Sequence, residues 1–513
     1  MKPIRLIAGF FTVGLWTLAS RILGFVREIL LLGLIGPGPV MDAFVAAFRL
    51  PNMFRRFFAE GAFNAAFVPM FSRKLEAGDD PAGFARDALN VLALAVLVLT
   101  GLGMVFMPAL VWATAYGFHA DMRFDMTVDL ARIAFPYIFF MALAALFSGI
   151  LNATGRFAAA AAAPVLLNIC VIGAMVCAWA FEAQVITWLI WAIPVAGVAQ
   201  LGLTWGAAAR AGFALRPGLP RFSPDVRRMM VVAVPAALSS GVMQINLVVG
   251  QLVASPFEGA ISWLFAADRL YQLPLGVVGI AVGIVLLPAL SRRLEAKDTQ
   301  GARDAFNRAA EMSLALALPA SVALLVVPFP LVQVLFERGA MTPEDSRAIA
   351  LAVTIYALGL PAFMMQKFLQ PLFFARSDTV RPFRYAVWAM AVNAVLAVGL
   401  IPWAGWLSPA IAASTAGWAM VWLLWRGSRD LGDVAQFDTR FKDRIWRIGA
   451  SAILMGLTLL IVAYGLASAL QTPGWRYLAL CALVTSGAFS YAVFAHVTGA
   501  LRLGELRAMM RRA

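Results

Sequence analysis

The chain has 513 residues, of which 62% are hydrophobic and only 13% are charged. A soluble protein of this length would carry about twice that share of charge, so we expect lipid to replace water over much of its surface. Its three cysteines stand in apolar stretches without a CxxC pair, and its two histidines have no metal-ligating residues clustered near them. We therefore expect no disulfide framework, no metal and no bound cofactor.

Fourteen stretches are long and apolar enough to cross the hydrocarbon as helices, which takes about 20 residues each. The first is interrupted by Arg21 and Arg27 and has no small-residue cleavage site after it, so we expect a retained helix rather than a signal peptide. In chain order the predicted spans are 7–33, 40–71, 88–114, 129–152, 158–180, 184–209, 229–254, 260–290, 309–335, 347–374, 382–402, 407–425, 446–469 and 475–498.

Basic residues are distributed unevenly between the alternating loops. Of the 41 lysines and arginines, 29 fall on one side, five on the other and seven within spans. Cytoplasmic loops carry such an excess, so both termini are predicted to be cytoplasmic. The net charge of +14 then reflects this bias and attraction to anionic membrane lipids, and nucleic acid need not be invoked.

The second half of the chain resembles the first at an offset of roughly 220 residues. AFRLPN…VPMFSRKLEA in 47–77 is similar to ADRLYQLP…LPALSRRLEA in 267–296. Three residues recur at an offset of 225: Pro136, Arg156 and Asn168 as Pro361, Arg381 and Asn393. Six spans per half give both halves the same sense, which is typical of transporters that rock two bundles about a central cavity. Chance likeness between apolar helices is the alternative, and the matched polar residues disfavour it.

Of the charged residues inside predicted spans, eleven stand out, and all of them lie in the first, second, eighth and tenth spans. An ionised side chain in mid-membrane costs at least about 2.5–3.5 kcal/mol, so such residues face a wet interior or one another. They are Arg21, Arg27, Arg49, Arg55, Arg56, Arg269 and Lys367, with Glu28, Asp42, Glu60 and Asp268.

Helical spacing places some of these charges on shared faces. Arg21 and Glu28 are nearly two turns apart and share a face. One stripe of the second span, close to Asn52, carries Asp42, Arg49, Arg56 and Glu60. Other interpretations stay open: arginines near span ends snorkel to the headgroups, acids only orient arginines, and Lys367 is either a pathway cation or a snorkelling residue.

Glycine and proline interrupt the two most charged spans. Pro51 removes a backbone hydrogen bond inside the second span and is expected to kink or open it. Gly24 and the Gly36-Pro37 pair give the first span similar freedom. We predict hinges at these four residues.

An excess of buried positive charge requires an anion. Guanidinium forks match phosphate oxygens two at a time, and several forks around one pyrophosphate compensate each other's desolvation. No P-loop, HExxH or GxSxG motif occurs in a suitable context, so we expect no catalytic residues and no enzyme activity. The residues thus predict a transport pathway for a large anionic substrate, with a pyrophosphate group favoured.

Three segments carry a family resemblance: SRILGFVRE (20–28), MDAFVAAFRLPNMFRRFFAEGAFNAAFVP (41–69) and SWLFAADRLYQLPLGVVGIAVGIVLLPALS (262–291). They resemble the bacterial lipid II flippase family MurJ, also called MviN, of the multidrug/oligosaccharidyl-lipid/polysaccharide exporter superfamily. The likeness covers essentially the whole chain. It implies an all-α polytopic fold of 14 transmembrane helices, with two pseudo-symmetric six-helix lobes around a central cationic cavity.

Within that fold we expect four parts. Residues 1–210 form the N-terminal lobe, 211–228 a cytoplasmic linker, and 229–426 the C-terminal lobe. Residues 427–513 add two helices, which the resemblance implies form a groove for the polyprenyl tail.

The residues and the resemblance together predict two groups of site residues. The substrate-binding group is Arg21, Arg27, Arg55, Arg269, Asp42, Asn52 and Ser262. The supporting charges are Glu28, Arg49, Glu60, Asp268 and Lys367. The family often has aspartate where this chain has Glu28, and lysine where it has Arg49. Periodicity favours Arg56 for the cavity whereas the resemblance favours Arg55, so that choice stays open.

The resemblance implies that undecaprenyl-pyrophosphoryl-MurNAc-pentapeptide-GlcNAc (lipid II) moves from the cytoplasmic to the periplasmic leaflet of the bacterial inner membrane, for cell-wall synthesis. We expect alternating access by a monomer, coupling to the membrane potential or a monovalent ion, and transient contact with the cell-wall synthesis machinery. The alternatives are an exporter of another lipid-linked oligosaccharide or of drugs, a membrane glycosyltransferase, and a structural scaffold.

Overall fold

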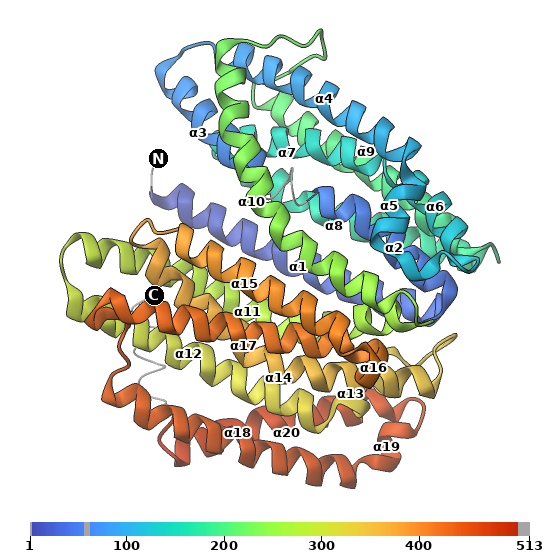
Figure 1. The fold of residues 1–513 in the computed structure, drawn as a ribbon, viewed down its shortest axis with the longest axis vertical. Helices are drawn as coiled ribbons and strands as arrows, with labels where there is room; N and C mark the ends of the chain where they lie inside the picture. The colour runs from blue at the N-terminus through green and yellow to red at the C-terminus, as the bar shows by residue number, and fades with distance from the viewer. Residues whose placement is uncertain (1–2, 56–61, 501–513) are drawn as a thin grey trace. The chain divides into compact units, whose positions relative to one another are not determined.

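The computed structural model describes residues 3–55 and 62–500, with side chains at 12–54, 66–233, 246–276 and 286–500. Every regular element within those residues is a helix, so the all-α prediction is confirmed for them (Figure 1). In chain order the elements are α1 (Pro3–Ile35), α2 (Pro39–Arg55), α3 (Ala62–Ala77), α4 (Pro81–Val105), α5 (Met107–Thr114), η2 (Tyr116–Phe118), α6 (Arg123–Ala134), α7 (Tyr137–Ala153), α8 (Phe157–Ala180), α9 (Val185–Arg210), α10 (Pro224–Ala254), α11 (Ala260–Glu295), α12 (Thr299–Val326), α13 (Pro328–Phe336), α14 (Pro343–Phe374), α15 (Val380–Gly399), α16 (Ile401–Ala404), η3 (Gly405–Leu407), α17 (Ser408–Ser428), η4 (Arg429–Leu431), η5 (Asp433–Ala435), α18 (Thr439–Gly465), α19 (Ala467–Gln471) and α20 (Trp475–Val497).

Local capping chemistry sets where several helices begin. Proline occupies the first turn of α4, α10 and α14, where its missing N–H would have no intrahelical partner anyway. Thr342 and Asp345 form a capping box at the start of α14. At the start of α18, the Asp438 side chain accepts a hydrogen bond from the Phe441 backbone N–H. These proline and capping residues set the helix starts, which apolar periodicity does not define.

Within the described residues, each predicted span is made up largely of helix, and several helices extend beyond the predicted bounds. Helix α12 begins at Thr299, ten residues before the predicted start at 309, because its polar first turns continue the helix without any need for apolar side chains. Over the described residues, ten helices are long and apolar enough to cross a membrane. The total of fourteen crossings stays a prediction.

The chain forms two compact units. Unit 1 comprises Met1–Ser262 together with Arg338–Met341, and unit 2 comprises Trp263–Glu337 and Thr342–Ala513. This division follows packing within the chain rather than the sequence repeat. The predicted boundaries after residues 210, 228 and 426 therefore stay predictions.

In unit 1, helix α9 packs against α7 and α8, and α8 also packs along α1 (Figure 1). A β-carbon added at Gly197 of α9 would lie 3.0 Å from both Tyr137 and Phe140, so this glycine lets α9 approach α7 closely. The buried Gln200 side chain joins all three helices, because it donates to the Ala163 carbonyl (2.7 Å) and accepts from the Tyr137 hydroxyl (3.2 Å). Small residues and interhelical hydrogen bonds are what hold helices together in lipid.

Unit 2 is built in the same way around α14, which packs against α12 and α17. The Ser321 hydroxyl of α12 donates to the Ala357 carbonyl of α14 at 2.6 Å. The Ser414 hydroxyl of α17 donates to the Ile355 carbonyl at 2.9 Å. A β-carbon at Gly359 would lie 2.7 Å from that same hydroxyl, so α14 and α17 touch where their side chains are smallest.

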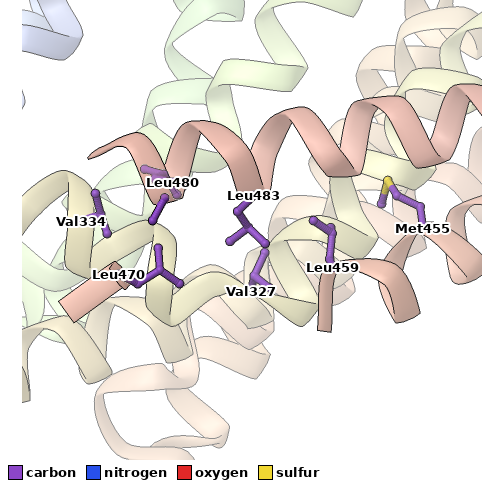
Figure 2. Close-up of a cluster of buried hydrophobic side chains, with 8 residues drawn as sticks. Val327, Val334, Met455, Leu459, Leu470, Leu480 and Leu483 are labelled. Atoms are coloured by element: carbon purple, nitrogen blue, oxygen red, sulfur yellow. The ribbon is translucent and has the colours of Figure 1, made fainter. Parts of the chain in front are cut away.

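The last two long helices, α18 and α20, dock onto α12 and α13. Figure 2 shows the apolar cluster that joins them, with side chains from four helices and the α12–α13 junction: Val327, Val334, Met455, Leu459, Leu470, Leu480 and Leu483. A β-carbon at Gly456 would lie 2.6 Å from Val322, and one at Gly487 would lie 2.9 Å from Leu459. Glycine therefore sets the close approach of α18 to α12 and of α20 to α18.

A cluster of charged residues anchors the N-terminal end of α18. Glu311 of α12 is almost completely buried and pairs with Arg308, Arg440 and Arg444. Arg308 also contacts Asp438, the capping residue of α18. The apolar packing along α18 and the ion pairs near its N-terminal end together fix α18 and α20 to the rest of unit 2.

Candidate functional site

Arg27 lies on α1 with 15% of its side chain exposed. Its Nη2 donates to the Glu28 carboxylate at 2.5 Å, and its Nη1 donates to the Asn168 side-chain carbonyl of α8 at 3.0 Å. Glu28 itself is almost fully buried. One acid and one amide thus hold the guanidinium in a fixed plane. These bonds use two of its five N–H donors.

The contact between α1 and α8 positions this arginine. Asn168 donates through Nδ2 to the Ser20 carbonyl of α1 at 3.0 Å while it accepts from Arg27. A β-carbon at Gly24 would lie 3.8 Å from Asn168, an ordinary contact, so the predicted hinge residue faces the helix that orients Arg27. Asn168 is therefore satisfied on both sides of its amide, which makes it a rigid support.

Arg21 lies nearly two turns before Glu28 on α1 and is exposed. Glu28, which was predicted to share a helix face with Arg21, forms an ion pair with the adjacent Arg27. Arg21 keeps an accessible positive charge.

Asp42 stands in the first turn of α2 and is completely buried. Its carboxylate accepts hydrogen bonds from the Gly259 N–H (2.7 Å), the Ser262 N–H (2.9 Å) and the Ser262 hydroxyl (2.6 Å). The two predicted residues Asp42 and Ser262 are thus in direct contact. The carboxylate caps the start of α11, where unpaired N–H groups favour a negative charge.

Arg123, the first residue of α6, lies beside this cap. Its Nη1 is 3.5 Å from Asp42 Oδ2, and the residue is only 5% exposed. Asp121 accepts from Arg123 Nε and Nη2, at 2.9 and 2.6 Å. These hydrogen bonds hold the pKa of Asp121 below its usual value.

The rest of α2 contributes fewer described contacts. Arg49 is half-buried and donates to the Leu247 carbonyl of α10 at 3.2 Å. Pro51 is buried inside α2 and Asn52 is half-buried. The side chain of Arg55, and all of Arg56 and Glu60, lie outside the described residues, so the choice between the two arginines stays open.

The predicted residues of unit 2 lie on α11 and α14. Asp268 accepts a hydrogen bond from Gln272 one turn later. The Arg269 guanidinium lies over the Phe265 ring at 4.6 Å from its centroid, an arrangement that keeps a cation beside an apolar surface. Lys367 is exposed, and its neighbour Gln366 donates to the Gly417 carbonyl at 3.1 Å.

The two predicted hinge residues Gly36 and Pro37 follow α1. Gly36 has a φ of 72°, a left-handed conformation that favours glycine, and a β-carbon there would lie 2.7 Å from the Ala340 carbonyl oxygen. The Ala340 N–H donates to the Gly33 carbonyl at 2.9 Å. The segment Arg338–Met341 therefore holds the end of α1.

Residues 32–485 match the family model of the lipid II flippase MurJ. The chain is also 42% identical over 526 residues to the probable lipid II flippase MurJ of Rhizobium meliloti (strain 1021), covering 99% of this chain and 97% of that relative. The chain belongs to the lipid II flippase MurJ family. MurJ proteins are flippases, so the family carries out transport rather than catalysis. With ten candidate spans among its described residues, this member is a multi-pass protein of the bacterial inner membrane.

Solved structures agree with the family in fold. A lipid II flippase MurJ in an inward closed conformation matches with a TM-score of 0.80 at 23% identity, over 94% of this chain and 98% of that one. An inward-facing multidrug resistance MATE transporter of the MOP superfamily matches with a TM-score of 0.66 at 14% identity, over 81% and 95%. These structures show the shared fold, while the family model and the relative confirm the predicted family. The predicted superfamily stays a prediction.

Sequence reasoning missed two residues that contact the predicted site residues: Arg123 beside Asp42 and Asn168 beside Arg27. Arg123 was counted only as one of five basic residues in the loops of one side, because its distance from Asp42 in the chain hides their contact. Asn168 was noted only as part of the repeat with Asn393, although a buried amide in an apolar helix already signals a specific polar partner. Among the residues that the structure describes, no three His, Cys, Asp or Glu side chains gather as metal ligands would.

Proposed function

We propose that this chain flips lipid II from the cytoplasmic to the periplasmic leaflet by alternating access. The observation that carries the proposal is the match of residues 32–485 to the lipid II flippase family model. The held guanidinium of Arg27 supports it physically, because a fixed fork suits the paired oxygens of a pyrophosphate.

In the proposed mechanism Arg21, Arg27 and Arg269 bind the pyrophosphate, with Arg55 and Asn52 completing the site. The buried Asp42 does not touch the pyrophosphate and instead ties α2 to the start of α11. Arg21 is exposed and supplies attraction, whereas Arg27 supplies geometry through its bonds to Glu28 and Asn168. The polyprenyl tail stays in lipid along the α18–α20 pair, whose exposed side chains include Ile461 and Phe489.

The proposed topology has fourteen crossings in two six-helix lobes with both termini in the cytoplasm. Its support is the distribution of 29 basic residues against five between alternating loops. An inside-negative potential would return the empty, cationic protein to its inward-open state, at about 2.3 kcal/mol per charge that crosses 100 mV. We propose this coupling, with a monovalent ion as the alternative energy source, and a monomer as the transporting unit.

The test is flipping of fluorescent lipid II in proteoliposomes that contain the purified protein. Changing Arg27 to Lys keeps the charge but loses the fork, and we expect a loss of about tenfold or more. Changing Arg21 to Lys keeps the exposed positive charge that attracts the substrate, so we expect flipping to continue at close to the wild-type rate. Arg156→Lys is the matched control, because Arg156 donates from an exposed position to the Arg210 carbonyl. Unimpaired flipping with Arg21 and Arg27 both changed to alanine would refute the proposal.

The competing function is export of another lipid-linked oligosaccharide or of drugs, which the likeness to a multidrug transporter favours. Competition distinguishes them: an excess of undecaprenyl pyrophosphate carrying other sugars should inhibit a general exporter as strongly as lipid II does. Repeating the assay with varied sodium, pH and membrane potential identifies the energy source.

A further inference from the structure

The carboxylate of Asp42 is removed from water, and its three hydrogen bonds come from Gly259 and Ser262. These donors lie more than 200 positions away in the chain. The first turn of α2 is thereby tied to the first turn of α11. A buried carboxylate also needs a compensating positive charge, since hydrogen bonds alone do not replace its hydration.

Arg123 supplies that charge from a fixed position. Its guanidinium is bound by both carboxylate oxygens of Asp121 and lies over the Phe118 ring at 4.4 Å from the centroid. Contacts on two sides therefore aim the remaining nitrogen, Nη1, toward Asp42 at 3.5 Å.

That nitrogen is buried and makes no hydrogen bond to any described atom. At 3.5 Å it neutralises Asp42 without bonding to it, while Asp42 bonds to the start of α11 instead. A buried donor left without an acceptor is unfavourable, so Nη1 would gain a hydrogen bond whenever the carboxylate turned toward it. The Asp42 carboxylate thus has two alternative sets of hydrogen-bond donors, those at the start of α11 and the Nη1 group of Arg123.

We propose that Arg123 is a positioning residue of the flipping cycle. It neutralises Asp42 while the carboxylate caps α11, and it takes over as the hydrogen-bond partner when the cap opens. No proton moves and no covalent bond changes, because only the partner of the carboxylate is exchanged. The inference rests on the proposed function, since a cap that opens and closes serves alternating access. If Arg123 only anchored the fold, its contacts with Asp121 and Phe118 would be sufficient. Its Nη1 group would then not need to point at Asp42.

The first test measures flipping in proteoliposomes for Arg123→Gln and Arg123→Lys. We expect a loss of about tenfold or more for the glutamine variant, which leaves a buried carboxylate without its cation, and recovery of most activity with lysine. Arg132→Gln is the matched control, because Arg132 lies on the same helix with 44% of its side chain exposed. In the double variant Asp42→Asn/Arg123→Gln, flipping should be no lower than in Arg123→Gln alone, since no buried anion then needs compensation.

The second test follows the cap without any substrate. Ala260 at the start of α11 is fully buried, so Ala260→Cys should react slowly with a charged maleimide in nanodiscs, in a background whose Cys170, Cys177 and Cys481 are changed to serine. Arg123→Gln should raise the labelling rate about tenfold and Arg123→Lys should restore it. Labelling of Arg123→Gln at the parental rate, or equal impairment of the lysine and glutamine variants, overturns the proposal. If the wild type does not move lipid II while labelling behaves as expected, the proposed function fails and the exchange of partners stands.

Discussion

The glycine at position 339 offers a sharp test of how the end of α1 is held. Gly339 has a φ of 59°, and a β-carbon there would lie 2.1 Å from the Gly33 carbonyl oxygen. That oxygen accepts the hydrogen bond from the Ala340 N–H at 2.9 Å. Changing Gly339 to alanine therefore both strains the backbone and forces two segments apart.

The two effects differ in size. A left-handed conformation costs a non-glycine residue about 1–2 kcal/mol. A carbon and an oxygen approach no closer than about 3.3 Å, so Arg338–Met341 must retreat by roughly 1 Å, which breaks the bond to Gly33. Its loss adds about 0.5–1.5 kcal/mol. The expected total is about 1.5–3.5 kcal/mol.

The assay is thermal denaturation of the purified protein in detergent, followed by tryptophan fluorescence. Gly78→Ala is the matched control, because Gly78 has a φ of 69° but a β-carbon there would meet nothing within 4 Å. Gly339→Ala should lower the midpoint about twice as far as Gly78→Ala, and it should also reduce flipping because α1 carries Arg21 and Arg27. Equal midpoints for the two variants would refute this explanation of how α1 is held.

Three further outcomes are expected. Asn168→Leu should reduce flipping about tenfold or more in proteoliposomes, because Arg27 and Ser20 lose a charge-assisted and a backbone hydrogen bond, while Asn168→Asp keeps the acceptor and should lose less. Gly456→Leu should separate α18 from α12 at Val322 and lower the thermal midpoint, whereas Gly465→Leu on the same helix, where a β-carbon meets nothing within 4 Å, should not. The fold lowers the pKa of Asp121, so its ionised carboxylate stabilises the folded protein fully above the unfolded-state pKa of about 4. This stabilisation is lost as the pH falls through the lower folded-state pKa. The difference in thermal midpoint between wild type and Asp121→Asn should therefore be constant at neutral pH and shrink below about pH 4.

The positions of the helices were predictable because apolar length alone identifies a helix in lipid, where every backbone group must be bonded within its own segment. Their ends were less predictable. The start of α12 lies in polar sequence before the predicted span, and the charged cluster of Arg308 and Glu311 there depends on α18, which periodicity does not place beside α12.

The candidate site was predictable in composition but not in pairing. The charges of α1 and α2 stand out in the sequence because lipid excludes them, and the structure puts Asp42 in contact with Ser262 as well as Arg27 in contact with Glu28. The pairing joins residues that are far apart in the chain, such as Arg27 and Asn168, which are separated by 141 positions. Neither helical spacing nor hydropathy contains that information.

The pairing also separates two roles that the sequence left merged. Arg27 is already compensated by Glu28, and Asp42 by Arg123, so these buried charges add little net field. Arg21 and Lys367 are exposed. A compensated guanidinium is cheap to keep in the membrane and holds its geometry, whereas an exposed cation attracts an anion from a distance but does not fix its orientation. In the proposed function, the exposed cations would therefore attract the pyrophosphate and the compensated Arg27 would orient it. Changing arginine to lysine should then be tolerated at Arg21 and harmful at Arg27.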